Sequence, residues 1–493
     1  MRFAGGQSSG LRSLGFLAVV LFCSHGLVRC QPADTATLRR IDHEAQRAPK
    51  GYEWLAWSTS TIGHRLTGSP QGARAEHTAD SLFRAGGADH VDYFPFTTRA
   101  WSRGTVRTTV IGSDGGEDLL TSVALALTPD SAEVTAEVVD AGNGLPADLA
   151  AVSSVMPGRI AIINIKLVDG PSGASNLHRS EKTALALAAG AIGVVFVNNV
   201  EGHVLLTGTA SASGDVLGVP VVCISQEEGA WLRARASADR GLRVHMRMAN
   251  RNAAVTARNV ICEIPGTEPD AGCIVVGGHL DSWDLATGAT DNGLGAYSIL
   301  DLARCYHALG LRPKRSIRFV LFMGEEEGLL GSTALVRAWR TEGFLPHVAC
   351  MINLDMSGHP RGFNVCGPAG WGDAVRSAQS AMTMLDTSFH GAFSQEPGLH
   401  SDHQPFMLAG VPVIAPICDL GDHVYGCYHS SCDDIRLVEP AAMVNNVRRV
   451  GQLLWHLANV DRLPPHFTDA GLRETLVTGG LEEKLRIQGE WPW

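Results

Sequence analysis

Apolar and polar positions follow a repeating order in the second half of the chain. Between about residues 259 and 463, short apolar runs alternate with longer amphipathic stretches. These predict strands at residues 273–278, 316–323, 348–354 and 411–416, and a helix at residues 294–309. Strands that alternate with helices form βαβ units, so the pattern predicts a largely parallel sheet with helices on both faces, an α/β/α sandwich.

The preceding region has a different pattern of apolar residues. Between about residues 131 and 254, β-branched runs predict strands at residues 159–165, 193–198 and 219–225, and an alanine-rich helix falls at residues 181–190. This region has no cluster of candidate acids, bases or metal ligands. We interpret it as a small α/β domain inserted into the larger one, where it covers the site or selects substrate.

Helical patterns are also found toward both ends of the chain. Ser69 and Pro70 form an N-cap and first-turn pair before a helix at residues 71–84, which Gly86 and Gly87 end. We expect this helix to pack on the predicted sheet. The residues after Pro464 form a polar tail with amphipathic stretches, to which the sequence assigns no role.

The beginning of the chain is typical of a secretory signal peptide. Arg2 and Arg12 precede an apolar run at residues 14–23 that is too short to span a bilayer. We therefore expect a leader over residues 1–30, with cleavage near Cys30, and a secreted or periplasmic protein. The alternatives are a buried N-terminal helix and a lipid anchor at Cys30, which Arg29 disfavours.

Composition narrows the function classes. At 493 residues the chain exceeds the usual size of one domain. Its formal charge of -10 is spread along the chain without long Lys/Arg runs, which argues against nucleic acid as a partner. No later apolar run is long enough to predict a membrane span.

Two of the eleven cysteines flank His429 in the sequence. Cys427 and Cys432 are close enough to form a disulfide, although the sequence leaves open whether they do.

Polar side chains follow the predicted strands where each strand ends. His279 follows the first strand, Glu325 and Glu326 follow the second, and Asp355 follows the third, while Asp291 lies in the loop before the helix. Parallel strands bind ligands at their carboxyl ends, so we expect these groups to meet there. Taken singly, an acid after a strand suits a solvated loop, and a lone histidine suits the core or surface. The hypothesis therefore rests on the whole set.

The chemistry of the set indicates metal-dependent hydrolysis. With His429 it comprises two imidazoles and three carboxylates, ligands that suit zinc, and Asp291 is the candidate to bridge two ions. Glu325 is not needed as a ligand and would act as the general base on water. Asp281 is placed to accept the second ring N–H of His279; the alternative is a surface acid at the strand end.

These residues lie in motifs that closely resemble the zinc exopeptidase family of carboxypeptidase Q (plasma glutamate carboxypeptidase) and secreted bacterial aminopeptidases. The motifs are GHRLTGS at 63–69, GGHLDSWD at 277–284, GATDNG at 288–293, LRPKR at 311–315, GEEEG at 324–328, NLDM at 353–356, SDH at 401–403 and YHS at 428–430. The resemblance covers nearly the whole mature chain except the tail.

The resemblance implies a zinc exopeptidase-like domain with a mixed, mainly parallel sheet, formed by residues 36–130 and 255–465. A protease-associated domain would fill residues 131–254, and residues 466–493 would be a tail. The family's metal positions carry over as His279, Asp291, Glu326, Asp355 and His429. They would hold two Zn²⁺ per chain, with Asp291 bridging and Glu325 as the catalytic base. Family members commonly have a cis peptide after the bridging aspartate, so we expect one at Asp291-Asn292.

The chain departs from the family's pattern in two places. The acid-then-threonine pair after the last ligand is replaced by Asp433 and Asp434. A tyrosine found in some relatives before Ser-Asp-His is absent here, where residues 398–400 read Gly-Leu-His. Oxyanion stabilisation could fall to His400, to Tyr428 or to the zinc ions alone, and Asp402 of the Ser-Asp-His motif is a further candidate around the metals.

The sequence thus predicts a secreted two-zinc exopeptidase that hydrolyses short peptides or dipeptides, as an aminopeptidase or a carboxypeptidase Q-like dipeptidase. A homodimer is one possible assembly. Two alternatives remain: a single-zinc acyl transferase resembling glutaminyl cyclases, and a non-catalytic receptor-like relative on the same fold. Whether the substrate is held by its free amine or its free carboxylate is left open.

Overall fold

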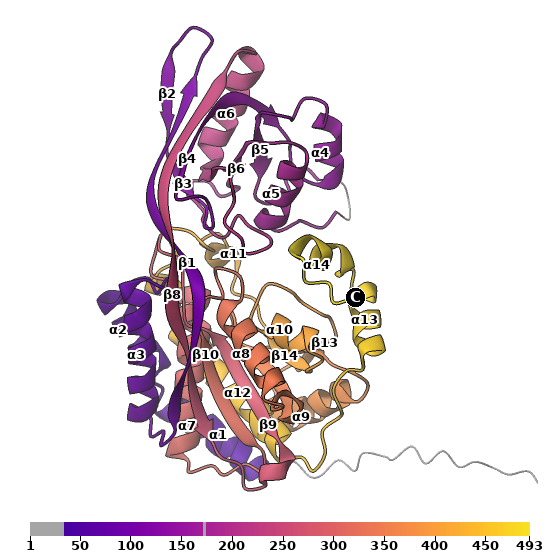
Figure 1. Cartoon of the computed structure of the whole chain (residues 1–493). Coiled ribbons are helices and arrows are strands. Elements are labelled where there is room, and N and C mark those ends of the chain that lie inside the picture. The colour runs from indigo at the N-terminus through magenta and orange to yellow at the C-terminus, as the bar shows by residue number, and fades with distance from the viewer. Residues whose placement is uncertain (1–33, 171–173) are drawn as a thin grey trace, which may run out of the picture. The chain divides into compact units, whose positions relative to one another are not determined.

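The computed structural model describes residues 34–170 and 174–493, so the expected leader and Cys30 lie outside the described residues. The strands form one 14-stranded sheet (Figure 1), in the order β13-β12-β14-β11-β9-β10-β8-β4-β5-β6-β7-β3, with β1 paired to β8 and β2 paired to β1. None of the described helices combines the length and low polarity that crossing a bilayer requires.

The half of the sheet that carries the predicted site is mainly parallel. Strands β14, β11, β9 and β10 pair in parallel, as do β12 and β13, whereas β8 and β12 join their neighbours β10 and β14 antiparallel. This confirms the predicted mixed sheet. The strands are β8 (Arg243–Ile264), β9 (Cys273–His279), β10 (Ser316–Phe322), β11 (Val348–Asn353), β12 (Gly362–Cys366), β13 (Ala392–Ser394) and β14 (Val413–Ile417).

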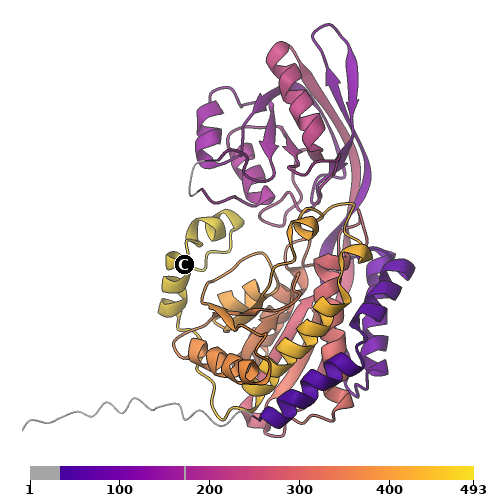
Figure 2. The same cartoon turned by 180° about the vertical axis from the view of Figure 1, so that it is seen from behind.

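Two helical layers cover this half. Ile274 and Val276 of β9 pack with one set of helices, and Cys273 and Val275 pack with another. Since strand side chains alternate between faces, the two sets lie on opposite sides of the sheet. The first set is α1 (Thr35–Arg47), α2 (Gly51–Thr61), α3 (Pro70–Ala85), α7 (Leu294–Ala308), α9 (Trp371–Leu385) and α12 (Pro440–Asn459); the second is α8 (Leu330–Thr341), α10 (His403–Leu408), α13 (Asp469–Thr478) and α14 (Glu482–Gln488). Figure 2 shows α1, in indigo, beside α12, in amber.

The predicted early helix is present as α3. The hydroxyl of Ser69 accepts a hydrogen bond from the backbone N–H of Gly72 at 2.9 Å, and Pro70 is the first helical residue. Glu76, on the buried face, accepts hydrogen bonds from the backbone and guanidinium of Arg258 in β8. The helix therefore packs on the sheet as expected.

The C-terminal segment, to which the sequence assigns no role, packs on the sheet. Its helices α13 and α14 bury Leu472, Leu476 and Leu485 in the same core cluster as β9 and β10 (Figure 1, yellow). The segment continues to the neighbourhood of the site, because Gln404 donates a hydrogen bond to Glu490 at 2.5 Å. The amphipathic stretches thus cover part of the sheet.

The inserted region continues the same sheet. The long strand β8 pairs with β1 (Val91–Ile111) and β4 (Ser131–Asp140). Beyond β4, the strands β5 (Ile160–Asn164), β6 (Gly193–Val197) and β7 (Val221–Ile224) run parallel at the predicted positions. The helices here are α4 (Pro146–Val152), α5 (Arg179–Ala188) and α6 (Gln226–Ala238). Two short strands that precede residue 131 pair with β1 and β7: β2 (Glu117–Leu120) and β3 (Ser122–Ala124).

Candidate metal centre

The predicted ligands gather at one edge of the sheet. His279 is the last residue of β9, and Glu325 and Glu326 follow β10. Asp355 comes just after the end of β11. The three strands are parallel, and Phe322 of β10 is in register with His279. Their carboxyl ends therefore bring these side chains together, as the sequence pattern predicts.

The loop before α7 adds Asp291 to this edge. Its peptide bond to Asn292 is cis, as expected. The side-chain amide of Asn292 donates to the carbonyl of Leu354 at 2.8 Å, and its oxygen accepts the N–H groups of Gly295 and Met356. Asn292 thus ties the Asp291 loop to the end of β11, where Asp355 lies.

The two oxygens of Asp291 face two different histidines. Oδ1 lies 3.3 Å from Nε2 of His279, and Oδ2 lies 3.0 Å from Nε2 of His429. Each histidine also approaches a second carboxylate: Asp355 Oδ1 is 3.4 Å from His279 Nε2, and Glu326 Oε2 is 3.0 Å from His429 Nε2. The structure therefore brings all five predicted ligands together in two groups that share Asp291.

The donor atoms of this cluster are better suited to bind divalent cations than to form hydrogen bonds with one another. Asp291 Oδ2 and Glu326 Oε1 are buried without a hydrogen-bond partner, although His429 lies close to Asp291 Oδ2. His279, Asp291 and Glu326 offer atoms that all lie within 4.8 Å of one another, and so do His279, Glu325 and Asp355. Buried carboxylates at this density need counter-charge, and imidazole with carboxylate is a ligand set suited to zinc.

Burial and mutual repulsion shift the pKa values in this cluster. Burial, followed by the charge of Asp291, raises the pKa of Glu326 well above its usual value. Burial favours neutral His279, but the charges of Glu325 and Asp355 outweigh it and raise the pKa of the imidazole well above its ordinary value. Divalent cations would reverse both shifts, because they favour ionised carboxylates and a neutral imidazole.

Glu325 lies beside the ligands in a position suited to proton transfer. Its Oε2 is 3.9 Å from Nε2 of His279, and its side chain is 10% exposed. Burial raises the pKa of Glu325 well above its usual value, with His279 opposing this shift and Asp355 adding to it. A carboxyl group in such an environment can accept a proton and hold it.

The contacts of Asp281 differ from the expected one, in which its carboxylate accepts the second ring N–H of His279. The ring Nδ1 of His279 lies 3.2 Å from the backbone carbonyl of Asp281 and 3.7 Å from its carboxylate. The carboxylate instead accepts the backbone N–H groups of Glu325 and Glu326, each at 3.3 Å, and the hydroxyl of Thr67 at 3.2 Å. Asp281 therefore holds the loop after β10 in place.

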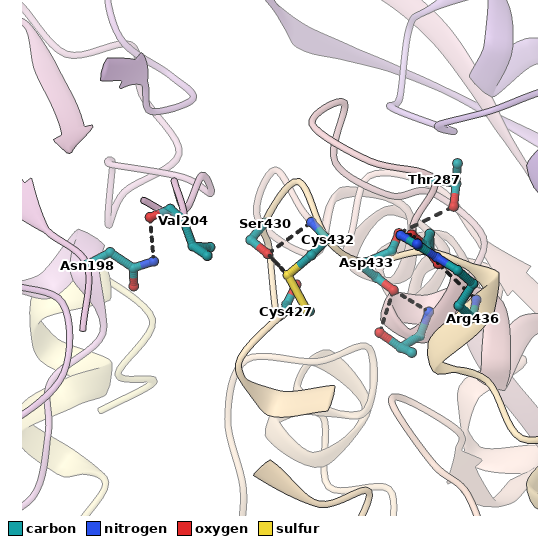
Figure 3. Close-up of a disulfide and its surroundings, with 10 residues drawn as sticks. Asn198, Val204, Thr287, Cys427, Ser430, Cys432, Asp433 and Arg436 are labelled. Atoms are coloured by element: carbon teal, nitrogen blue, oxygen red, sulfur yellow. Dashed lines mark hydrogen bonds and ion pairs between the residues drawn. A yellow bond between two sulfur atoms is a disulfide. The ribbon is translucent and has the colours of Figure 1, made fainter. Parts of the chain in front are cut away.

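The His429 loop is closed by a disulfide between Cys427 and Cys432 (Figure 3), which answers the question that the sequence left open. Ser430 donates to the carbonyl of Cys427 at 2.8 Å inside this loop. The ring of Tyr428 stacks on that of His429 with centroids 3.7 Å apart. Tyr428 thus packs against a proposed ligand, and its oxyanion role stays a prediction.

Asp433 organises the loop that carries the shared ligand. Its Oδ1 accepts the N–H and hydroxyl of Thr290, at 2.8 and 2.6 Å, and its Oδ2 accepts the N–H of Asp291 at 3.0 Å. Burial raises the pKa of Asp433 to about 6. Asp434 instead forms an ion pair with Arg436. Sequence reasoning noted the charge of this pair but not the role of its first member.

The Ser-Asp-His motif supports Asp355. The hydroxyl of Ser401 donates to Asp355 Oδ2 at 2.6 Å and accepts from the amide of Asn353 at 2.8 Å. Asp402 is fully buried, and burial raises its pKa to about 7. His400 faces the inserted domain, where its ring stacks on His178 with centroids 4.7 Å apart. The oxyanion role considered for His400 has no support from these contacts.

Sequence reasoning quoted the early GHRLTGS motif without assigning it a role. Its Arg65 is fully buried and donates to the carbonyls of Leu280, Thr287 and Gly288. These bonds fix the loop between His279 and Asp291. The arginine inside this short motif was the available signal.

Comparison with known proteins agrees with this geometry. Residues 259–454 match Peptidase family M28, and residues 134–232 match the PA domain. The M28 match spans the part of the chain that carries all five predicted ligands. It confirms the predicted resemblance and the predicted enzyme class, a zinc metallo-exopeptidase.

Several known proteins match over most of the chain. Carboxypeptidase Q of Bos taurus is 24% identical over 399 residues, which cover 80% of this chain and 82% of that protein. The solved structure of a peptidase M28 precursor from Shewanella amazonensis SB2B has 24% identity and a TM-score of 0.77, covering 88% of this chain and 99% of that one. A zinc aminopeptidase from Bacillus subtilis has 24% identity and a TM-score of 0.63, covering 84% and 96%. The two structures share the fold of this chain.

Proposed function

We propose that this protein is an exported two-zinc exopeptidase that hydrolyses dipeptides or other short peptides. The observation that carries the proposal is the division of the ligands around Asp291. Its two carboxylate oxygens face different imidazoles, and a second carboxylate accompanies each imidazole. One shared carboxylate between two such groups is the arrangement that a pair of co-catalytic ions requires.

Each residue of the centre has a distinct role in this proposal. His279 and Asp355 would hold one zinc ion, Glu326 and His429 would hold the other, and Asp291 would contact both. When bound, the two ions would polarise the scissile carbonyl and lower the pKa of a water molecule. The names of two relatives, a carboxypeptidase and a zinc aminopeptidase, support zinc and peptide substrates.

Glu325 would move the proton. Its carboxylate would accept a proton from the attacking water and deliver it to the nitrogen of the leaving amine. The side chain of Glu325 is only 10% exposed, so its carboxyl group is largely shielded from bulk water between these two steps. Hydrogen bonds from the backbone of Glu325 and Glu326 to Asp281 keep this carboxylate beside the ligands.

The domain limits and the location belong to the same proposal. The catalytic domain would comprise residues 36–130 and 255–465, the protease-associated domain residues 131–254, and the C-terminal segment residues 466–493. The PA match at residues 134–232 supports the position of the insertion. A leader at residues 1–30 would direct the chain to the exterior or the periplasm. A homodimer remains a prediction.

Metal analysis and a dipeptide library test the activity. We expect two zinc ions per chain, loss of hydrolysis on chelation, and its return when zinc is added. Glu325→Gln should retain the metal while kcat falls by roughly 10² to 10⁴-fold, since it removes only the proton acceptor. Glu342→Gln on the surface is the matched control and should change neither quantity. Full activity of Glu325→Gln, or one zinc per chain, would contradict the proposal.

A further inference from the structure

Arg179 is a buried cation without a charged partner in the described part of the chain. It is the first residue of α5 in the inserted domain and is only 6% exposed. Its Nε is buried without a hydrogen-bond partner, and its guanidinium forms no ion pair within residues 34–170 and 174–493. An unpaired charge at this depth is costly, so the position favours binding of an anion.

Packing holds this guanidinium beside the chain that contacts the metal centre. A side chain at Gly208 would collide with it, since a Cβ there would come within 1.9 Å of Nη2 of Arg179. The residue before Gly208, Thr207, donates its backbone N–H to the carbonyl of His429 at 2.9 Å. Leu206 forms a β-bridge with Ser430 in the same loop. Glycine at position 208 therefore makes room for a cation next to the His429 loop.

Contacts on both sides of Arg179 connect it to the proposed ligands. Its guanidinium lies against Gly208, and the neighbouring Thr207 bonds to the backbone of His429. His178, directly before Arg179, stacks on His400, and the next residue after His400, Ser401, donates to Asp355. The guanidinium is thus placed to attract a negatively charged group of a molecule bound at the metals.

We propose that Arg179 binds a carboxylate of the peptide substrate, namely the free C-terminal carboxylate of a dipeptide. The inference rests on the proposed peptidase function and specifies its substrate class. A guanidinium presents a planar pair of N–H donors that matches a carboxylate. In a dipeptide the C-terminal carboxylate is one residue from the scissile carbonyl, so a cation beside the metal centre can reach it. An acidic side chain would offer the same chemistry, and the test separates the two sources.

The experiment compares three peptides on the zinc-loaded full chain: Leu-Ala, Leu-Ala-amide and Leu-Glu-amide. We expect kcat/KM for Leu-Ala to exceed that for Leu-Ala-amide by roughly tenfold or more, the effect of one hydrogen-bonded charge. Arg179→Met should remove this preference by lowering kcat/KM for Leu-Ala alone, and Arg179→Lys should restore part of it. Arg240→Met, which changes an exposed arginine of the same domain, is the matched control.

Other outcomes overturn the inference in distinguishable ways. If Leu-Glu-amide, rather than Leu-Ala, loses activity in Arg179→Met, the carboxylate belongs to a side chain and the C-terminal assignment is wrong. If all three peptides lose activity equally, Arg179 has a structural role. If the wild type prefers Leu-Ala but Arg179→Met keeps that preference, another group binds the carboxylate. Failure of the wild type on every peptide would instead refute the proposed function.

A binding measurement removes the dependence on turnover. In the zinc-loaded Glu325→Gln background, calorimetry can measure the affinity for intact Leu-Ala and Leu-Ala-amide. Adding Arg179→Met should weaken Leu-Ala roughly tenfold and leave Leu-Ala-amide unchanged. Equal weakening of both peptides would contradict carboxylate recognition even if the variant had reduced stability.

Discussion

At the scale of single residues, a few side chains fix the position of Asp291, the proposed shared ligand. Its carboxylate lies between His279 and His429, while its backbone N–H is held by Asp433. Asp433 is not among the predicted ligands, yet its carboxylate accepts three hydrogen bonds from the two residues Thr290 and Asp291. The position of the proposed shared ligand therefore depends on a neighbouring carboxylate.

We expect Asp433→Asn to weaken zinc binding by about 10- to 100-fold, the usual effect of losing a group that orients a metal ligand. An amide has only one accepting oxygen, so it cannot serve both Thr290 and Asp291. The measurement is zinc retained during titration with a competing chelator. Asp434→Asn is the matched control, because that carboxylate pairs with Arg436 instead. Equal affinities of the two variants would show that Asp433 is not needed for metal binding.

Some residues of the site can be identified from short sequence motifs, whereas others can be identified only from the fold. The five proposed ligands and Glu325 were identifiable because each stands in a short sequence motif, and four of these six residues come at or just after the end of a strand. The actual acceptor for the ring of His279 is a backbone carbonyl, and its position depends on the path of the chain after β9. Arg179 belongs to no motif, and only folding of the insertion brings it near His429. Contacts between segments that are distant in the chain could thus not be predicted from the sequence.

At the scale of elements, the strands that carry the ligands were predicted closely. The predicted strand at residues 316–323 is β10, Ser316–Phe322, and the helix at residues 294–309 is α7, Leu294–Ala308. Continuous apolar runs bounded by turn residues give a strong signal for buried parallel strands. The C-terminal helices were harder to assign, because their apolar positions are few and their partners include segments as distant in the sequence as β9 and β10. Their contribution to the core depends on tertiary packing, which a local sequence pattern does not predict.

The packing of α13 predicts that this helix stabilises the catalytic sheet. Leu476 is fully buried in the cluster that includes β9 and β10, so Leu476→Ala should lower the free energy of unfolding by about 2–5 kcal/mol. The adjacent Val477 is 47% exposed, and Val477→Ala should have little effect. Denaturant titration of both variants measures the difference. A Leu476→Ala variant as stable as the wild type would show that α13 is dispensable for the fold.

At the scale of the whole molecule, the proposed metal centre joins segments that are far apart in the chain. Three parallel strands and the loop before α7 supply His279, Asp291, Glu326 and Asp355, while His429 comes from a disulfide-closed loop. That loop also bonds to the insertion through Thr207. Ions bound at this point would therefore hold the β9 edge, the His429 loop and the insertion to one another.

Metal removal should consequently destabilise the whole fold as well as abolish catalysis. A ligand that binds only the folded state adds about 2.7 kcal/mol when its concentration is a hundred times its Kd, and without zinc the buried carboxylates repel one another. We expect the chelated chain to unfold at a lower temperature, with the loss reversed by zinc. Glu325→Gln should show the same zinc-dependent shift, because it keeps all five ligands. If chelation abolished hydrolysis while leaving the unfolding temperature unchanged, the ions would serve chemistry alone, and the junction between the two domains would be held by protein contacts such as Thr207 with His429.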